Sequence, residues 1–228
     1  MANTALITGG IGGLGGAVTD AFVKAGWRVV VPVLPELMES ASAPGAELIA
    51  ADLTDVASVA EAVVLAAADP AQPLGAVVNL VGGYAAGGRV HETSIKDFEA
   101  QLTLNLRPTY LVTAAGLPHL LASGGGAVVC VSSRAAEQPF SGAAGYITGK
   151  AAVSAFVDAL NAEYRQDNIR VNAVLPSVID TPANRAAMPD ADWTRWVAPA
   201  EIAAVILHLC GEESRAVTGT KVRVYGRA

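Results

Sequence analysis

Charged side chains are scarce in this sequence, because only 16% of its 228 residues are Asp, Glu, Lys or Arg whereas 52% are hydrophobic. The formal net charge is −6, so the chain lacks the positive balance of a protein whose main partner is nucleic acid. An apolar fraction this large predicts a thick core built on a sheet whose two faces are both covered, and it is compatible with a buried subunit interface.

Cysteine and histidine are scarce as well. Cys130 and Cys210 both fall in apolar segments. This predicts core packing in a reducing compartment, rather than a disulfide or a catalytic thiol, and we expect a cytoplasmic protein. The histidines His91, His119 and His208 stand far apart with no Asp, Glu or Cys at ligand spacing, so no metal site is predicted.

No segment is expected to cross a membrane or to direct export. Residues 108–133 lack Asp, Glu, Lys and Arg, but Pro118 and the glycines at 124–126 divide them into a helix and a strand. The first residues, MANTALITGG, show no basic region followed by an apolar run and a cleavage site, so a signal peptide is not expected.

Short apolar runs alternate with longer helical patterns along the chain. Runs such as VVVPV and AVVCV are continuously apolar, which is typical of parallel strands buried on both faces. The expected strands are 4–8, 28–33, 47–50, 76–80, 127–132, 170–175 and 221–224, and the expected helices are 13–25, 56–68, 95–121, 144–166 and 199–211. This alternation predicts a single α/β domain over residues 1–228, a Rossmann-type doubly wound parallel sheet of about seven strands with helices on both faces.

Tyr146 and Lys150 stand four residues apart in the helix expected at 144–166. Such residues share a helix face, with Cβ atoms about 5–6 Å apart. A phenol has a pKa of about 10, so acid/base work near pH 7 needs a shift of about 3 units, which a nearby ammonium supplies most directly. With a serine at a neighbouring strand end to hold a substrate oxygen, the pattern predicts carbonyl chemistry. The alternative is an exposed tyrosine above a solvated lysine.

A glycine-rich turn, TGGIGGLG at residues 8–15, follows the first expected strand and opens the first helix. Glycine permits a tight turn and the close approach of a pyrophosphate, and a helix N-terminus supplies free N–H groups and a positive dipole end. Its place between a strand and a helix favours a dinucleotide site over a flexible turn. The expected contacts are Gly9, Gly12, Gly13, Leu14 and Gly15.

Further cofactor contacts are expected after the third and fourth strands. Asp52, with Leu53 beside it, could accept a hydrogen bond from an adenine amino group; the alternative for Asp52 is a helix N-cap, which Asp55 fills better. Asn79 and Gly82 follow the fourth strand, where glycine would allow close backbone approach or form a plain turn.

The order of these motifs resembles that of the short-chain dehydrogenase/reductase family over essentially the whole chain. After the glycine turn come Asp52, Asn79-x-x-Gly82, Asn105, Ser133, Tyr146-x-x-x-Lys150, Asn172-x-x-x-Pro176 and Thr181. The resemblance implies hydride transfer with NAD(H) or NADP(H) on one Rossmann-type domain, on a small-molecule carbonyl or alcohol substrate.

The resemblance also implies residue roles. Tyr146 would be the general acid/base, Lys150 would bind the nicotinamide ribose and lower the tyrosine pKa, and Ser133 would hold the substrate oxygen. Asn105 would support a water-linked proton relay, and Thr181 would contact the nicotinamide carboxamide. Asn105 also interrupts the apolar pattern LTLNLRPTYLV, so a buried partner, a water or a helix bend before a proline is expected for it. The serine before Ser133 is less favoured, because adjacent strand residues face opposite sides.

The sequence departs from the family pattern around the cofactor ribose. Val33 stands where an Asp for a ribose 2′-hydroxyl is expected, and Gly12 stands where NADP-using members carry a basic residue. Glu36 is a poorly placed substitute for that Asp. Because the pocket also lacks a cation to bind a 2′-phosphate, we expect NAD(H) rather than NADP(H). Pro176 is followed by serine instead of glycine, and Pro176 and Ile179 are the remaining expected cofactor contacts.

Two alternatives remain open. The segments VGGYAAGG and VIDTPANRAAMPDADWTRWVAPAEI look like those of dihydropteridine reductases, which use NADH to reduce a quinonoid pterin and lack the serine that this chain has at 133. A non-catalytic dinucleotide-binding sensor is the other alternative, against which the joint presence of all four catalytic candidates argues.

The irregular stretch 177–198 is the candidate substrate lid. Within it, Arg185, Met188, Trp193 and Trp196 would line the substrate pocket, unless the two tryptophans only pack a helix on the body. The helices expected at 95–121 and 144–166 carry apolar residues on more than one face, so a homodimer or homotetramer is expected.

Overall fold

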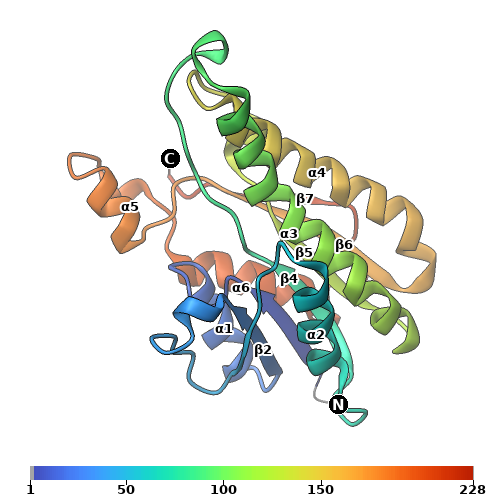
Figure 1. Ribbon diagram of the computed structural model, residues 1–228. Coiled ribbons are helices and arrows are strands. Elements are labelled where there is room, and N and C mark those ends of the chain that lie inside the picture. Colours follow the sequence, from blue (N-terminus) through green and yellow to red (C-terminus); the bar gives the residue numbers. More distant parts are fainter. Residues whose placement is uncertain (1–2, 228) are drawn as a thin grey trace.

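The protein is described by a computed structural model that covers residues 3–227. Its centre is a seven-stranded parallel sheet in the order β3-β2-β1-β4-β5-β6-β7 (Figure 1). The strands are β1 Thr4–Thr8, β2 Arg28–Val33, β3 Glu47–Ala50, β4 Leu74–Asn79, β5 Gly126–Val131, β6 Ile169–Pro176 and β7 Lys221–Val224. The predicted fold class is confirmed. The strand order reverses between β1 and β4, and in such sheets ligands bind outside the carboxyl ends of the strands at that point.

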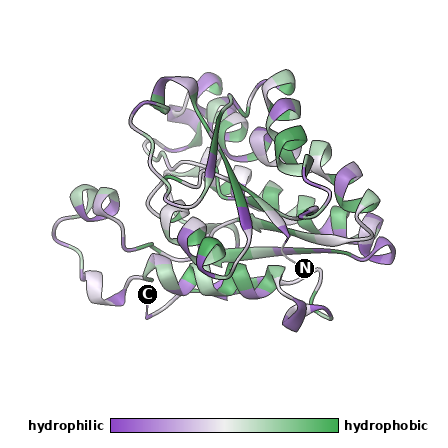
Figure 2. Cartoon of the chain, turned by 90° about the horizontal axis from the view of Figure 1, so that it is seen from below, coloured by the Kyte–Doolittle hydropathy of each residue, from purple (hydrophilic) through white to green (hydrophobic). Residues whose placement is uncertain are grey.

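Helices cover both faces of the sheet. They are α1 Gly15–Lys24, α2 Val56–Ala67, α3 Ile95–Ala122, α4 Ala144–Tyr164, α5 Pro182–Ala187 and α6 Pro199–Cys210. One core cluster joins the sheet to α1 and α6, and a second joins it to α2, α3 and α4. In Figure 2 the helices show alternating apolar and hydrophilic bands, as expected of helices with one face on a sheet.

Strand β2 shows why the apolar runs are continuous. Val29, Val31 and Val33 belong to the cluster with α1 and α6, whereas Val30 belongs to the cluster on the opposite face. Because successive side chains of a strand point to opposite faces, a strand buried on both faces needs an apolar residue at every position. Burying one such valine contributes about 1.5–3 kcal/mol.

The structure differs from the sequence-based expectation in two segments that matter for the site. Helix α1 begins at Gly15 rather than at residue 13, because residues 9–14 are used in the turn that precedes it. The stretch 177–198, expected to be irregular, contains the short helix α5 and a 3-10 turn at Trp193–Arg195. Helix α5 projects from the body of the molecule (Figure 1). Among the helices within residues 3–227, none combines the length and apolarity needed to cross a bilayer.

Candidate active site

The glycine turn between β1 and α1 has the geometry of an anion cradle. The Gly12 N–H donates to the Gly9 carbonyl at 3.0 Å, and Gly9 adopts the left-handed φ of 68°. A Cβ at Gly15 would lie 1.9 Å from the Gly9 oxygen, so only glycine fits there. No side chain caps α1, and its first turn carries no acidic residue. The free N–H groups and the helix dipole therefore suit a phosphate.

The start of the candidate lid packs on this turn. Thr181 is buried, and its Cγ2 lies 2.8 Å from where a Cβ of Gly13 would stand. Its Oγ1 accepts a hydrogen bond from the Asn184 N–H at 3.2 Å and so caps α5. Pro176 ends β6, and Ile179 pairs with Val197 in an isolated parallel bridge. Thr181, one of the residues predicted to contact a cofactor from β6 onward, thus packs against the glycine turn.

The loop after β4 joins Asn105 to Lys150. Asn105 is fully buried; its Nδ2 donates to the carbonyls of Gly83 and Gln101, each at 3.0 Å, and its Oδ1 accepts from the Gly83 N–H at 3.1 Å. A Cβ at Gly82 would lie 2.7 Å from both Asn105 Oδ1 and Lys150 Nζ. The buried partner expected for Asn105 is therefore backbone, and a glycine is required where the loop meets the two side chains.

Lys150 is an almost fully buried cation. Its Nζ donates to the Val131 carbonyl at 3.0 Å, at the carboxyl end of β5. Burial lowers the pKa of Lys150 to about 8, against a smaller opposing effect of Cys130. The ammonium form therefore still predominates at neutral pH, but its charge is held in an environment that disfavours it.

Ser132 fastens the same part of α4 to the strand. Its hydroxyl donates to the Lys150 carbonyl at 2.7 Å, and the Ser154 hydroxyl donates to Ser132 Oγ at 2.9 Å. Both serines are buried. Ser132 thus contacts the backbone of α4 at Lys150, whereas Ser133 contacts the Tyr146 side chain nearer the start of the same helix.

Ser132→Ala is expected to lower kcat about 10-fold through a displaced Lys150, because shifts of about 1 Å can cost up to 10²-fold. The matched control is Ser154→Ala, which also removes a buried hydroxyl but keeps the bond to the Lys150 carbonyl. Both variants should lose stability, with only the first losing kcat, as measured by steady-state kinetics and thermal melts. Equal losses of kcat in the two variants would show that Ser132 has a structural role alone.

Tyr146 lies near the start of α4, beside Ser133. Burial raises the pKa of Tyr146, a hydrogen bond with Ser133 lowers it, and the neighbouring Tyr84 phenol raises it. This direction is opposite to the lowering of the Tyr146 pKa expected from the sequence, because burial has the largest effect. Ser133 has an extended backbone, and its Oγ also accepts the Ala135 N–H at 3.1 Å.

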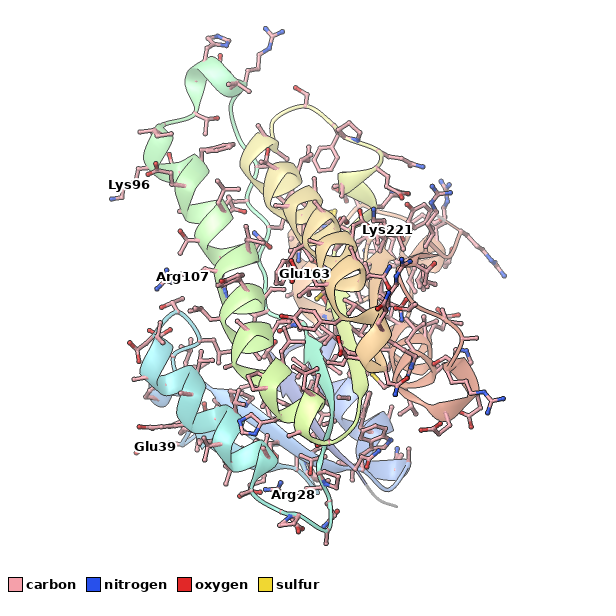
Figure 3. The ribbon with its side chains drawn as sticks, turned by 90° about the vertical axis from the view of Figure 1, so that its right-hand side faces the viewer. Arg28, Glu39, Lys96, Arg107, Glu163 and Lys221 are labelled. Carbon is pink, nitrogen blue, oxygen red and sulfur yellow. The ribbon has the colours of Figure 1, made fainter. Side chains whose placement is uncertain are left out.

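Several expected cofactor residues are used locally in the structure. Asp52 Oδ1 accepts from both the N–H and the hydroxyl of Thr54, each at 2.8 Å. Asp55 accepts a hydrogen bond from the Ser58 N–H at 2.8 Å and so caps α2, the role for which the sequence favoured Asp55 over Asp52. Arg107 on α3 donates to the Thr54 carbonyl at 2.9 Å and fixes this loop (Figure 3). The loop that carries Asp52 is therefore braced from both sides.

Other expected contacts have buried side chains. The Asn79 Nδ2 donates to Thr113 Oγ1 at 2.9 Å, inside the core, so only its backbone faces the loop that follows β4. Its Oδ1 is buried without a hydrogen-bond partner among residues 3–227. Leu53 belongs to the core under α2, and Val33 to the core under α1 and α6.

The aromatic residues of the lid contact one another. Arg185 makes a two-pronged ion pair with Asp180 at 2.5 and 2.7 Å, and its guanidinium lies 4.7 Å from the Trp193 ring centre. Trp193 Nε1 donates to the Met188 carbonyl at 3.0 Å, and its ring lies 6.4 Å from that of Trp196. These contacts brace the lid internally, and the predicted lining of a substrate pocket by these side chains stays a prediction.

Sequence reasoning assigned no role to Tyr84 or Phe140. The Tyr84 ring lies 5.1 Å from the Tyr146 ring, at an interplanar angle of 89°. Phe140 lies 6.4 Å from Tyr84. The position of Tyr84 could have indicated a role in binding, because Tyr84 directly follows a glycine pair after a strand, where binding residues concentrate.

Comparisons with known proteins agree with this geometry. The profile of the family described as short chain dehydrogenase matches residues 3–192. The chain is 31% identical to 2,5-dichloro-2,5-cyclohexadiene-1,4-diol dehydrogenase LinX of Sphingobium indicum, over 97% of this chain and 94% of that one. It is 28% identical to 2-(R)-hydroxypropyl-CoM dehydrogenase of Xanthobacter autotrophicus, over 99% and 98% of the two chains.

Solved structures show the same fold. A short-chain dehydrogenase/reductase family protein superposes with a TM-score of 0.87 and 32% identity, over 98% of this chain and 96% of that one. The structure described as ElxO with NADP bound superposes with a TM-score of 0.90 and 24% identity, over 99% and 98% of the two chains.

Proposed function

From the premise that this chain belongs to the short-chain dehydrogenase/reductase family, we propose that it transfers hydride between a nicotinamide cofactor and a carbonyl or alcohol carbon. That it is an enzyme of the dehydrogenase class follows from the family. The specific reaction is supported by two contacts: Asn105 and Lys150 both approach Gly82, and Ser133 lies beside Tyr146. A glycine turn that leads into an uncapped helix N-terminus follows strand β1 of the same sheet.

The residues present fit a dinucleotide. The N–H groups of the turn at residues 9–15 would hold its pyrophosphate, and Thr181 would reach the nicotinamide from the start of the lid. Cofactor contacts at Asp52, Leu53, Asn79 and Gly82 stay predictions from the sequence. When bound, the cofactor supplies a hydride to a carbonyl carbon or accepts one from an alcohol carbon.

Four side chains of the protein take part in the proton transfer. In the reducing direction Tyr146 donates its phenolic proton to the carbonyl oxygen, while Ser133 donates a hydrogen bond to that oxygen. The C=O bond becomes CH–OH by gaining one hydride and one proton. The Lys150 ammonium stabilises the phenolate that remains, and a proton returns through water near Asn105. The oxidising direction runs the same steps in reverse.

The names of the relatives and the residues of the site favour an alcohol or a ketone, rather than a pterin, as the substrate. Two relatives have names that describe a hydroxyl-bearing substrate: a cyclohexadiene-diol dehydrogenase and a hydroxypropyl-CoM dehydrogenase. Ser133 beside Tyr146 supplies the oxygen-binding donor that such a substrate needs. Reduction of a quinonoid pterin stays a prediction from sequence resemblance.

The test is oxidation of NADH and NADPH against ketones, 3-oxoacyl thioesters, quinones and quinonoid dihydropterin. Turnover of a ketone or thioester supports the proposal. Turnover of the pterin alone contradicts it and makes Ser133 incidental. Tight cofactor binding without any turnover would favour the non-catalytic sensor.

NAD(H) remains our preferred cofactor, and position 34 offers the sharpest test. The buried Val33 would place a substituted carboxylate in the core under α1 and α6, whereas Leu34 is 41% exposed. Leu34→Arg is expected to raise kcat/KM with NADPH about 10-fold, because a charge-assisted hydrogen bond contributes about 1.5–3 kcal/mol. Leu37→Arg, at a residue 42% exposed, is the matched control. An equal gain in both variants, or none in the first, would place 2′-phosphate recognition elsewhere.

Pairing of copies through α3 and α4 also remains our prediction. The two helices lie side by side (Figure 3). Tyr110 on α3 is 54% exposed although its ring packs 5.7 Å from Phe156 on α4. Such apolar surface would be covered in a homodimer or homotetramer.

A further inference from the structure

One exposed aromatic ring lies beside the Tyr146 phenol, and a second exposed ring lies beside the first. Tyr84, in the loop after β4, meets the Tyr146 ring edge-to-face at 5.1 Å. Phe140, in the loop after β5, lies 6.4 Å from Tyr84 with an interplanar angle of 47°. We call Tyr84 and Phe140 the aromatic rim. The mechanism described above uses neither residue.

The backbone holds the rim in place. The residue before Tyr84, Gly83, is fixed through both its N–H and its carbonyl by Asn105, at 3.1 and 3.0 Å. The two loops are joined by a hydrogen bond of 2.8 Å from the Gly87 N–H to the Gly142 carbonyl. Gly142 has a φ of 86°, and a Cβ there would lie 2.7 Å from the Gly87 oxygen. The rim therefore has a fixed position relative to the catalytic side chains.

The rim is open to a ligand. Tyr84 is 62% exposed and Phe140 is 48% exposed. A cavity of about 300 Å³ lies between the two loops that carry the rim, although neither rim residue lines it. Its lining includes small apolar residues and polar ones: Ala85, Ala86, Ala143, Ala144, Glu92, Thr93, Asp97 and Gln101. Ser133, Tyr146 and Lys150 do not line this cavity. The exposed rim thus offers aromatic ring faces to a ligand that approaches Tyr146 from the side of Tyr84.

We propose that the aromatic rim is the specificity determinant of this enzyme, and that it selects a ketone or alcohol whose reacting carbon lies in, or is bonded directly to, a flat unsaturated six-membered ring. The inference rests on the proposed function, since it places the ring next to the oxygen that Tyr146 protonates. A flat ring can stack or meet edge-on with both rim residues, at centroid distances of about 4.5–7 Å. Each such contact is worth about 2- to 10-fold in affinity, which a puckered ring or an open chain does not gain fully.

The kinetic test compares two ketones with the same skeleton, acetophenone and cyclohexyl methyl ketone. Wild-type enzyme is expected to prefer acetophenone in kcat/KM. Tyr84→Ala should reduce that preference about 10-fold, whereas Tyr84→Phe, which keeps the ring, should retain it. Val90→Ala is the control on the same loop, because Val90 is 75% exposed and lies outside the rim. A Tyr84→Ala variant that loses activity equally on both ketones overturns the inference.

A binding measurement separates failure of the rim from failure of the proposed reaction. Acetophenone is titrated by calorimetry into enzyme saturated with NAD⁺, where a ketone has no hydride to accept. A dissociation constant about 10-fold weaker in Tyr84→Ala supports the rim, even if no ketone is turned over and the proposed function fails. Equal dissociation constants in wild type and Tyr84→Ala overturn the rim, even if ketones are reduced.

Discussion

Tyr146→Phe is expected to lower kcat about 10²–10⁴-fold, the usual contribution of a positioned general acid or base. The substitution removes only the phenolic oxygen. The ring that meets Tyr84 edge-to-face remains, and the contacts of Gly82, Asn105 and Lys150 do not involve that oxygen. Dinucleotide affinity should therefore stay within a few-fold. Steady-state kinetics with the best substrate of the panel, and fluorescence titration with NADH, measure the two quantities.

Tyr164→Phe is the matched control for that experiment, because Tyr164 is the last residue of the same helix. It should keep wild-type kcat. Two outcomes would contradict the assignment of Tyr146: retention of most of the activity in Tyr146→Phe, or a loss of NADH binding as large as the loss of turnover. The second outcome would mean that the phenol contributes to binding rather than to proton transfer.

The secondary-structure elements that carry the candidate catalytic residues could be predicted from the sequence, because they depend on local rules. The burial of β2 on both faces and the glycine turn before α1 follow from residue types at fixed spacing. Tyr146 and Lys150 fall on one helix face for the same reason. The direction of the Tyr146 pKa could not be predicted, because its largest cause is burial, which depends on how distant segments pack around the phenol.

Other features depend on contacts between distant segments. Helix α5 was missed because it has six residues and begins with a proline, too short to show a helical period. The Asn79 side chain lies inward because Thr113 on α3 offers it a partner. The contact of Tyr84 with Tyr146 joins the loop after β4 to the first turn of α4, two segments that lie far apart in the chain. Nothing in the local pattern encodes such a pair.

Lys150→Met is expected to reduce kcat/KM about 10²–10³-fold, the effect of removing one charge-stabilising group from an active site. The ammonium would no longer stabilise the Tyr146 phenolate or hold the nicotinamide ribose. Unlike Tyr146→Phe, this substitution should therefore weaken cofactor binding as well as lower kcat. Methionine has a similar length and no branch, so the buried space can be filled without strain.

The same variant should also show how much the buried charge of Lys150 destabilises the fold, through the pH dependence of the Tm. The pKa of Lys150 is lowered from 10.5 in the unfolded chain to about 8 in the folded one. Between these values the unfolded state binds more protons, so wild-type stability rises as pH rises through this window. The cost is complete below about pH 8 and is absent above about 10.5. The Tm of Lys150→Met minus that of wild type should therefore be largest near pH 7 and decrease towards pH 10.

Lys96→Met provides the control, because Lys96 is exposed near the start of α3 (Figure 3). Its Tm difference from wild type should not change with pH in this way. A difference for Lys150→Met that stays constant between pH 7 and pH 10 would mean that Lys150 is not charged at a cost in the folded protein. The loss of activity would then have to come from the missing bond to the Val131 carbonyl. A decreasing difference, together with the lost activity, would mean that the enzyme maintains an unfavourable buried cation because proton transfer at Tyr146 requires it.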